Sequence, residues 1–125
     1  MTAAEKVLAE IEHTSLSRDA VGRWGKHHPQ TGFLPIIGRE KGSVLEDLVK
    51  KYQPSLILEV GALVGYSAIL MGMHLKRGKI ISLEFDPRAA DVARENIKKA
   101  GLKGKIEVIV GDAREIIPKL KGKFD

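Results

Sequence analysis

Acidic residues and glycines follow three apolar runs of the sequence, at positions where they could hold a small ligand. Glu59 lies in the first run and is followed by Gly61 and Gly65. Glu84 lies near the end of the second run, and Asp112 comes just after the third. An acid at the end of the second strand of a nucleotide-binding sheet can accept both hydroxyls of a ribose. Glycines allow the backbone to approach a ligand closely.

The charges of these residues indicate what kind of ligand would fit. Glu59 would repel a polyphosphate and attract a positive group, such as the ammonium of an amino acid. Asp112 could accept a hydrogen bond from an exocyclic amine such as that of adenine. A ribose, an adenine, an ammonium and no phosphate together describe S-adenosylmethionine. Each residue also has a simpler interpretation: turn glycines at 61 and 65, a surface ion pair at Glu84, and helix caps at Ser67 and Asp112.

Other ligand and catalytic motifs fail at single positions. A dinucleotide fingerprint starting at Gly61 would require glycine at Leu63 and Tyr66, and a phosphate-binding loop would require lysine at Tyr66. A hydrolase elbow around Ser67 fails because Ile69 replaces its last glycine. The histidines lack metal-ligand spacing and are interpreted as surface or loop residues: His13, His27, His28 and His74.

The apolar runs have strand length and are nearly continuous in Ile, Leu and Val, as in strands covered on both faces. They span Leu56–Val60, Ile80–Phe85 and Ile106–Val110. Helical patterns separate them, so we expect parallel strands joined by right-handed crossovers in an open α/β sheet with helices on both faces.

Capping residues set the expected helix limits. A Ser43–Glu46 capping box would begin the helix that precedes the first strand, and the next helix would span Ser67–Leu75 and be ended by Gly78. Asp86 and Pro87 would begin the third helix, which Gly101 closes, and Asp112 with Glu115 would open the fourth.

The N-terminal region reads as helical fragments followed by a loop. Thr2 and Glu5 have capping-box spacing, and Val7, Leu8 and Ile11 form one apolar stripe. A second short helix is expected after Ser17, burying Val21 and Trp24. Residues 25–42 contain several Gly and Pro and are expected to form an irregular loop.

Composition limits the class of protein. The chain has 125 residues, 43% of them hydrophobic and 30% charged, which suits one globular domain or part of one. No apolar run approaches the ~20 residues of a membrane span. The absence of cysteine excludes disulfides and thiolate metal sites, and we expect a cytoplasmic location. The whole net charge of +5 lies in residues 76–125, which allows an anionic partner such as RNA, although lysines on solvated helix faces explain it as well.

Several of these segments resemble motifs of small-molecule O-methyltransferases of the catechol O-methyltransferase type. The similarity covers roughly residues 30–125 and, more loosely, the N-terminal helices. It rests on segments 36–38, 41–42, 58–61, 65–68, 82–84, 110–113 and 116–118. The resemblance implies a Rossmann-like class I methyltransferase fold with strand order 3-2-1, from which the remainder of a seven-stranded sheet is missing. Residues 1–42 would be N-terminal helices and a cofactor-covering loop, and residues 43–125 the first half of the S-adenosylmethionine-binding domain.

The resemblance also implies which residues bind the cofactor. Glu59 and Gly61 would hold the methionine moiety, Ser67 its carboxylate and Glu84 the ribose hydroxyls. Asp112 suits the bacterial and archaeal branch of the family better than the animal one. The full expected set is Ile37, Glu59, Gly61, Gly65, Tyr66, Ser67, Glu84, Phe85, Asp112, Ala113 and Arg114. Ile37 would close the cofactor through its backbone, and Ala113 with Arg114 would line the adenine pocket.

The family orients an acceptor hydroxyl on a divalent metal such as Mg²⁺, which lowers the hydroxyl pKa for in-line attack on the methyl group. Its catalytic residues and metal ligands are expected after Asp125, so this chain alone is expected to be inactive. Two alternatives stay open: a tRNA hydroxyuridine O-methyltransferase and a non-catalytic half-domain. The strand order would leave Leu56–Val60 as an apolar edge, so self-association into a homodimer is expected.

Overall fold

A computed structural model describes residues 1–15 and 35–125 of the chain. Its centre is a parallel three-stranded sheet in the order β1-β2-β3, formed by Leu56–Val60, Lys79–Glu84 and Ile106–Val110. The expected strands and their order are therefore confirmed. The register places Glu59 beside Ser82 on the neighbouring strand, so two polar side chains lie at the same level of the sheet.

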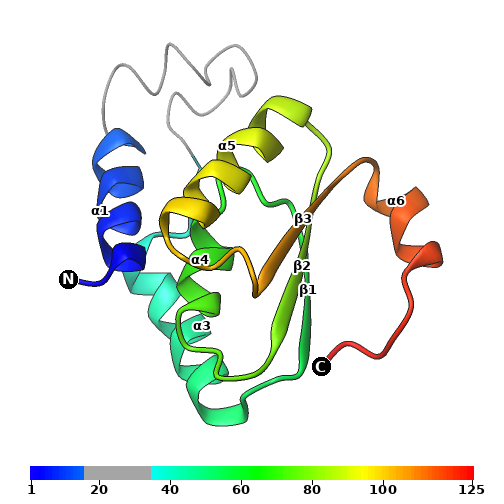
Figure 1. Ribbon diagram of the computed structural model, residues 1–125, viewed down its shortest axis with the longest axis horizontal. Helices are drawn as coiled ribbons and strands as arrows, with labels where there is room; N and C mark the ends of the chain where they lie inside the picture. The colour runs from blue at the N-terminus through cyan, green and yellow to red at the C-terminus, as the bar shows by residue number, and fades with distance from the viewer. Residues whose placement is uncertain (16–34) are drawn as a thin grey trace.

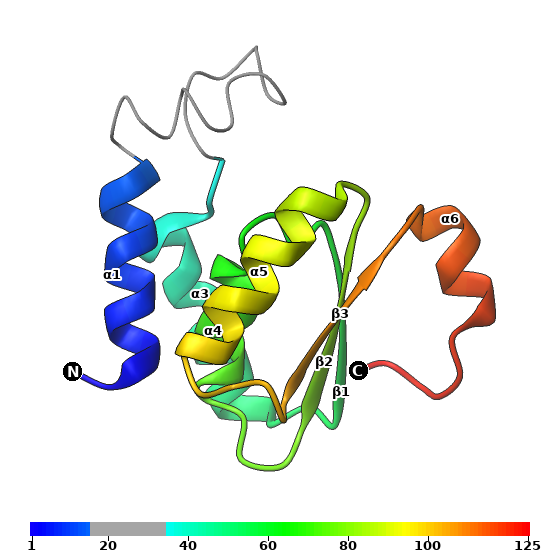
Figure 2. The same cartoon turned by 45° about the horizontal axis from the view of Figure 1, so that its top comes forward.

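Helices cover the two faces of the sheet unequally (Figure 1). α4 and α5 pack against one face, with α1 and α3 outside them, while α6, η1 and the C-terminus lie on the other face (Figure 2). Among the described residues, no helix is long and apolar enough to cross a membrane. The helices are α1 (Ala3–Ser15), α3 (Gly38–Tyr52), α4 (Tyr66–Gly72), α5 (Pro87–Lys99), α6 (Ala113–Ile116) and the 3₁₀-helix η1 (Ile117–Lys119).

The buried core lies between the sheet and the thick helical layer. Ala68, Ala90 and Ala93 are fully buried, and their small side chains let α4 and α5 approach each other and the sheet closely. α1 adds the apolar stripe expected from the sequence, in which Leu8 is also fully buried. The N-terminal helix is thus docked by apolar burial, which stabilises by about 25 cal/mol for each Å² of apolar surface removed from water.

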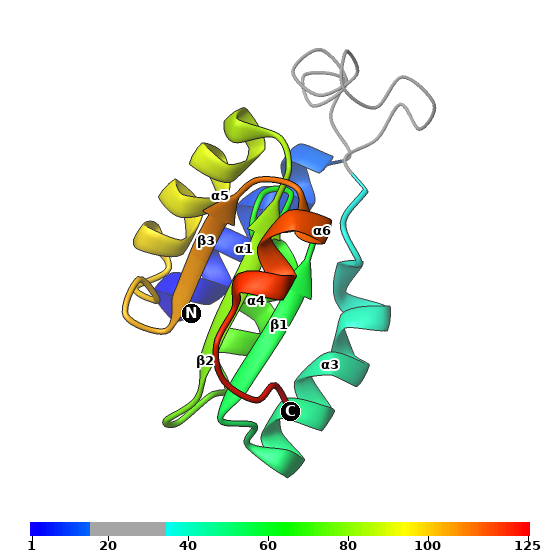
Figure 3. The same ribbon diagram turned by 90° about the vertical axis from the view of Figure 1, so that its right-hand side faces the viewer.

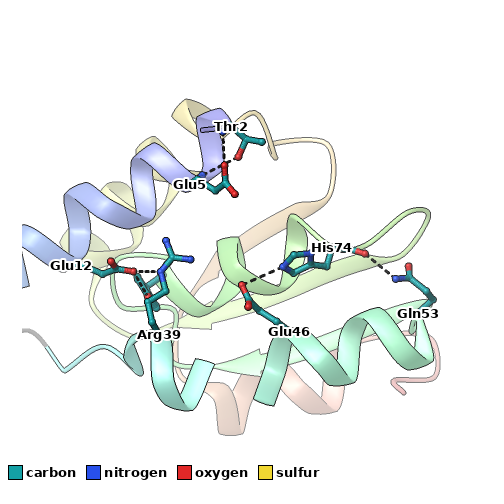
Figure 4. Close-up of polar contacts among 8 residues, drawn as sticks. Thr2, Glu5, Glu12, Arg39, Glu46, Gln53 and His74 are labelled. Carbon is teal, nitrogen blue, oxygen red and sulfur yellow. Dashed lines mark hydrogen bonds and ion pairs between the residues drawn. The ribbon is translucent and has the colours of Figure 1, made fainter. Parts of the chain in front are cut away.

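Most local helix signals are confirmed. The amide of Glu5 donates to the Thr2 hydroxyl at 3.1 Å, and the Thr2 amide donates to the Glu5 carboxylate at 2.6 Å (Figure 4). Asp86 caps α5 by accepting from the Arg88 amide at 2.9 Å, with Pro87 in the first turn. Gly101 follows α5 at a φ of 74°, a backbone conformation that favours glycine.

The expected start of α3 at Ser43 is wrong. α3 begins at Gly38, and the Ser43 hydroxyl lies inside it, donating to the Glu40 carbonyl at 2.6 Å. Residues 38–42 are therefore helical rather than part of an irregular loop. Gly42 does not break the helix because α4 packs against it: a Cβ there would lie 2.5 Å from the Leu70 Cδ2 atom.

Two other helices are shorter than expected. α4 ends at Gly72 instead of Leu75, and the helix after β3 is one turn, Ala113–Ile116, continued by η1. Gly78 lies in the turn before β2, where a Cβ would clash with the Pro54 carbonyl oxygen at 2.1 Å. The helix expected after Ser17, with Val21 and Trp24, lies outside the described residues.

Gln53 joins the C-terminal end of α3 to the turn after α4. Its backbone has a φ of 43°, and its side-chain Nε2 atom donates to the Val49 carbonyl at 3.1 Å. The same atom donates to the His74 carbonyl at 2.9 Å (Figure 4). Its side-chain carbonyl accepts from the Lys76 amide at 3.0 Å. The half-buried ring of His74 contacts Glu46 of α3 at 3.3 Å. These bonds fasten the two helices at the amino end of the sheet.

β1 is an edge strand, with β2 as its only strand neighbour in the described part of the chain. The start of its open side is covered by Asp125, whose carboxylate accepts from the amides of Ser55 and Leu56 at 2.9 and 3.0 Å. The Asp125 amide donates to the Leu56 carbonyl at 2.9 Å. α3, which flanks this edge in Figure 3, carries an exposed apolar stripe of Val44, Leu48 and Tyr52.

Candidate functional site

The expected ligand residues of β1 and β2 converge at the carboxyl ends of these strands, where the arrowheads lie in Figure 3. The two oxygens of the Glu59 carboxylate accept from different hydroxyls: Ser67 at the start of α4, and Ser82 of β2 at 2.6 Å. Ser67 therefore does not cap α4, which was its simpler interpretation. Its hydroxyl instead fixes a carboxylate at the end of the neighbouring strand.

Burial raises the pKa of the Glu59 carboxyl above its ordinary value. The hydrogen bonds from Ser67 and Ser82 act in the opposite direction, and the nearby charge of Glu84 adds to the rise. Among the described residues, no cation contributes to the pKa of this carboxyl. A cation placed beside it would stabilise its charged form, which is the property expected of a site for an ammonium group.

Glu84 is fixed by the backbone on both sides of the site. One carboxylate oxygen accepts from the Leu63 amide at 2.7 Å and the other from the Asp86 amide at 2.9 Å. Leu63 has a φ of 50°, which is uncommon for a residue with a branched side chain. Because each carboxylate oxygen has more than one acceptor position, Glu84 can still accept from two vicinal hydroxyls.

The two glycines of the first turn differ in what surrounds them. Gly61 has a φ of 93°, and no atom lies within 4 Å of the position that a Cβ would occupy, so its side-chain direction is open. Gly65 has a φ of 87°, and a Cβ there would lie 3.3 Å from the Ala93 carbonyl oxygen of α5. The absence of a side chain at Gly61 therefore leaves room for a ligand, whereas at Gly65 it leaves room for α5.

Tyr66 follows Gly65, but its side chain points away from the strand ends. The ring is 2% exposed, and the hydroxyl donates to the Glu12 carboxylate of α1 at 2.6 Å. Burial, followed by the hydrogen bond to Glu12, raises the pKa of the Tyr66 phenol above its ordinary value. Because this side chain is engaged with α1, only the backbone of Tyr66 stays available for the expected contact with a ligand.

The end of β3 has a different arrangement. Asp112 caps α6 by accepting from the Arg114 amide at 2.9 Å, and it pairs with the Arg114 guanidinium at 2.6 Å. This hydrogen bond from the Arg114 side chain lowers the pKa of the Asp112 carboxyl. The Arg114 side chain is 90% exposed, and Ala113 stands between these residues at the start of α6. The simpler interpretation of Asp112 as a helix cap is confirmed, while its contact with adenine stays a prediction.

The remaining expected residues are exposed at the same end of the molecule. Ile37 caps α3 and is 37% exposed, and Phe85, directly after β2, is 75% exposed. Figure 3 shows that α3 starts at the end of the sheet toward which the strands point. Large apolar side chains that are exposed beside a polar site provide apolar contact area for a ligand.

Sequence reasoning missed two groups of this site. Ser82 is fully buried and its hydroxyl donates to Glu59; its signal was a small polar residue in the interior of an apolar run. The amide of Leu63 had no signal, because leucine does not favour the left-handed conformation. Within residues 1–15 and 35–125, no cluster of three or more His, Cys, Asp and Glu could hold a metal ion.

Comparisons with known proteins identify the family. The sequence profile of the family described as O-methyltransferase matches residues 19–125. The chain is 34% identical over 122 residues to catechol O-methyltransferase of Bos taurus, covering 97% of this chain and 40% of the bovine protein. It therefore spans less than half the length of that relative.

Solved structures show the same fold. The O-methyltransferase from Bacillus cereus, in complex with SAH, has a TM-score of 0.68 and 28% identity over 98% of this chain and 60% of its own. The SAH-bound methyltransferase PaMTH1 of Podospora anserina has a TM-score of 0.69 and 28% identity over 98% of this chain and 54% of its own. The expected Rossmann-like methyltransferase fold is thereby confirmed.

Proposed function

Because this chain belongs to the O-methyltransferase family, we propose that its strand ends bind S-adenosylmethionine for methyl transfer to a hydroxyl group. The observation that carries the proposal is the pair of carboxylates at adjacent strand ends. Glu59 is held by two hydroxyls and Glu84 by two backbone amides, so both are fixed before any ligand binds. Preorganised acceptors favour binding because little ordering is left to be done.

The residues fit the cofactor group by group. Glu84 would accept the ribose hydroxyls, and Glu59 would lie near the ammonium. The open side of Gly61 would admit the methionine moiety close to the backbone. Ile37 would cover the cofactor from α3, and Ala113 and Arg114 would border the adenine. When bound, the sulfonium cofactor supplies an electrophilic methyl group, and this chain's residues hold and orient it.

Titration of S-adenosylhomocysteine (SAH), the demethylated cofactor, into the protein tests this assignment. Glu84→Ala removes a charged acceptor, so we expect the affinity to fall about 10- to 100-fold, from roughly 1.5–3 kcal/mol of lost hydrogen bonding. Glu107→Ala, an exposed glutamate of β3, is the matched control and should bind as the unaltered protein does. Equal binding by Glu84→Ala would refute the ribose assignment.

The acceptor is proposed to be a catechol-like small molecule whose hydroxyl is oriented by a divalent metal. The described residues contain no cluster fit to hold that metal. We expect a polypeptide of these 125 residues to bind SAH without transferring methyl groups. In the active enzyme, transfer to a catechol should stop on addition of EDTA and resume with excess Mg²⁺. Transfer that EDTA leaves unchanged would refute the metal.

An RNA acceptor is the second candidate, because it would use the positive charge of residues 76–125. The structure places Lys79 at the start of β2 and Lys105 just before β3, at the opposite end of the strands from Glu59 and Glu84. We therefore favour the small molecule. RNA binding with a steep decrease in affinity as salt rises would favour the tRNA alternative, because phosphate contacts release counterions.

Self-association is proposed for a polypeptide of these 125 residues. Beyond the contact of Leu56 with Asp125, the open edge of β1 continues to Val60, which is 63% exposed. The exposed stripe of Val44, Leu48 and Tyr52 flanks that edge. Unpaired apolar edges favour pairing with another chain. Sedimentation at micromolar concentration should show a dimer that Leu48→Lys weakens, and a stable monomer would refute the proposal.

A cytoplasmic location is also proposed, from the absence of cysteine in the sequence. Fractionation of cells that express the protein should place it with cytoplasmic enzymes, and recovery with membranes or the medium would refute the proposal.

A further inference from the structure

Glu12 of α1 joins three segments that are distant in the sequence. Its Oε1 atom accepts from the Tyr66 hydroxyl at 2.6 Å and from the Nε atom of Arg39. Tyr66 begins α4, and Arg39 lies in the first turn of α3. Figure 4 shows Glu12 on α1 facing Arg39 on α3.

Each partner of Glu12 lies next to a residue of the proposed cofactor site. Tyr66 is bonded in sequence to Ser67, whose hydroxyl donates to Glu59. Arg39 lies two residues after Ile37, the residue expected to cover the cofactor. One carboxylate oxygen therefore connects the floor of the site, at the start of α4, with its cover, at the start of α3.

Docking of α1 itself does not depend on these bonds. Val7, Leu8 and Ile11 bury the apolar stripe of α1 in the core, whereas the side chains of Glu12 and Arg39 are 30% and 46% exposed. Partly exposed ion pairs add little to stability. These bonds instead fix the start of α3 relative to the start of α4.

We propose that Glu12 is a positioning residue for the cofactor site, which holds the start of α4 through Tyr66 and the start of α3 through Arg39. The inference rests on the proposed function, because its effect is on cofactor affinity. Glu12 lies more than 40 residues before the first strand-end motif, outside every motif of the site.

Titration of SAH into four forms of the protein tests the inference: unaltered, Tyr66→Phe, Glu12→Gln, and the double variant. Each single change should weaken binding about three- to tenfold, the range of one hydrogen bond. Both changes act on the same bond, because Tyr66→Phe removes its donor and Glu12→Gln removes the charge of its acceptor. The double variant should therefore bind about as weakly as the weaker single variant. Tyr66→Phe keeps the buried ring, so the core is preserved.

Two matched controls distinguish a positioning effect of Glu12 and Tyr66 from the general loss of a charge or a hydroxyl, and the Tm distinguishes it from a loss of stability. Glu10→Gln removes an exposed carboxylate from the same helix, and Tyr52→Phe removes a hydroxyl from an exposed tyrosine of α3; both should bind SAH like the unaltered protein. All titrations are done well below the lowest Tm of the set. A purely structural role would lower the Tm and leave the affinity of the folded protein unchanged.

The outcomes distinguish this inference from the proposed function. If the unaltered protein binds no SAH, the proposed function fails and the inference fails with it. If the unaltered protein binds SAH and the Tyr66→Phe and Glu12→Gln variants bind equally well, the inference alone is wrong. It is also wrong if the effects of the two changes multiply in the double variant, because they would then act independently.

Discussion

The carboxylates at the ends of β1 and β2 each accept a hydrogen bond from a segment at least 20 residues away, whereas the carboxylate after β3 is held by its own neighbour. Glu59 accepts from Ser67 and Ser82, eight and 23 residues away. Asp112 accepts from the backbone and side chain of Arg114, two residues away. The first arrangement exists only when the sheet and α4 are assembled, while the second can form in any chain that makes the turn.

The two carboxyls also differ in their pKa values. Burial raises the pKa of Glu59, and the hydrogen bond from Arg114 lowers that of Asp112. A buried carboxylate without a positive partner is costly to the folded protein and gains when a cation binds. A surface carboxylate with an arginine beside it has little left to gain. We therefore expect ligand binding to depend more strongly on the ends of β1 and β2 than on the end of β3.

Gly61→Val, at the end of β1, should lower the affinity for SAH more than any other change considered below. The valine side chain would project into the open space beside Gly61, where the methionine moiety is proposed to lie. We expect SAH affinity to fall by about 100-fold or more in a calorimetric titration, with the circular dichroism spectrum retained. The φ of 93° adds strain of roughly 1–2 kcal/mol.

Gly101→Val is the matched control for that strain. Gly101 has a φ of 74° and open space around its Cβ position, but it lies after α5, away from the strand ends. It should lose similar stability and keep its affinity for SAH. Equal loss of binding in both variants would show that Gly61 matters for the fold and not for the ligand.

Glu59→Gln should change stability and affinity in opposite directions at neutral pH. An amide avoids the cost of a buried charge, so the Tm of the ligand-free protein should rise by a few degrees. Without the negative charge, the attraction for the ammonium is lost, and we expect about a tenfold weaker affinity for SAH. Thermal unfolding and titration measure the two effects, and a lower Tm with unchanged affinity would contradict the role given to Glu59.

The raised pKa of Glu59 also fixes the sign of a pH dependence. In the folded protein the carboxyl gains a proton at a higher pH than in the unfolded chain. Its contribution to stability is therefore greatest below the unfolded pKa and is lost as the pH rises through the folded pKa. SAH affinity should follow the opposite course and fall as the pH falls through the folded pKa.

Titrations at several pH values measure this dependence. Glu59→Gln should bind SAH with a flatter pH dependence, because the group that titrates is gone. An affinity for SAH that falls identically in both proteins would assign the dependence to another group.

Asp112→Asn should have the smallest effect. Asparagine also caps helices well, and the change leaves the Arg114 guanidinium exposed to water, so stability should change by less than about 1 kcal/mol. We expect SAH affinity to fall by less than about threefold, because a neutral side chain can still accept from an adenine amine. A loss as large as that of Glu84→Ala would show that the end of β3 binds the cofactor as strongly as the other two.

The strands and most helix caps could be predicted because their signals are local, whereas the strand order came from the family resemblance. Each strand is a nearly continuous apolar run, and Asp86 with Pro87 marks a helix start within two residues. The start of α3 could not be predicted in this way. Gly42 reads as a helix breaker in the sequence, and only the contact with Leu70 of α4 explains why it is tolerated.

The candidate site likewise contains residues that local signals predict and contacts that only the fold creates. Glu84 and Gly61 were predictable from strand ends, because parallel strands bring their carboxyl ends together. The bond of Tyr66 to Glu12 joins residues 54 positions apart, and no spacing rule predicts it. Leucine itself does not favour the backbone φ of 50° at Leu63. This conformation accompanies the hydrogen bond that the Leu63 amide donates to the Glu84 carboxylate.

The fastening of α3 at its two ends has a consequence for how quickly a ligand could enter and leave. At the amino end of the sheet, the Gln53 side chain ties α3 to the turn after α4 through two hydrogen bonds to backbone groups of His74 and Lys76. At the other end, the side chain of Arg39 reaches a single carboxylate. The start of α3 is held by this ion pair and by the packing of Gly42 on Leu70 of α4, so opening of the pair would loosen the start of the helix. Residence time, and not only affinity, would then depend on how often the Glu12–Arg39 pair opens.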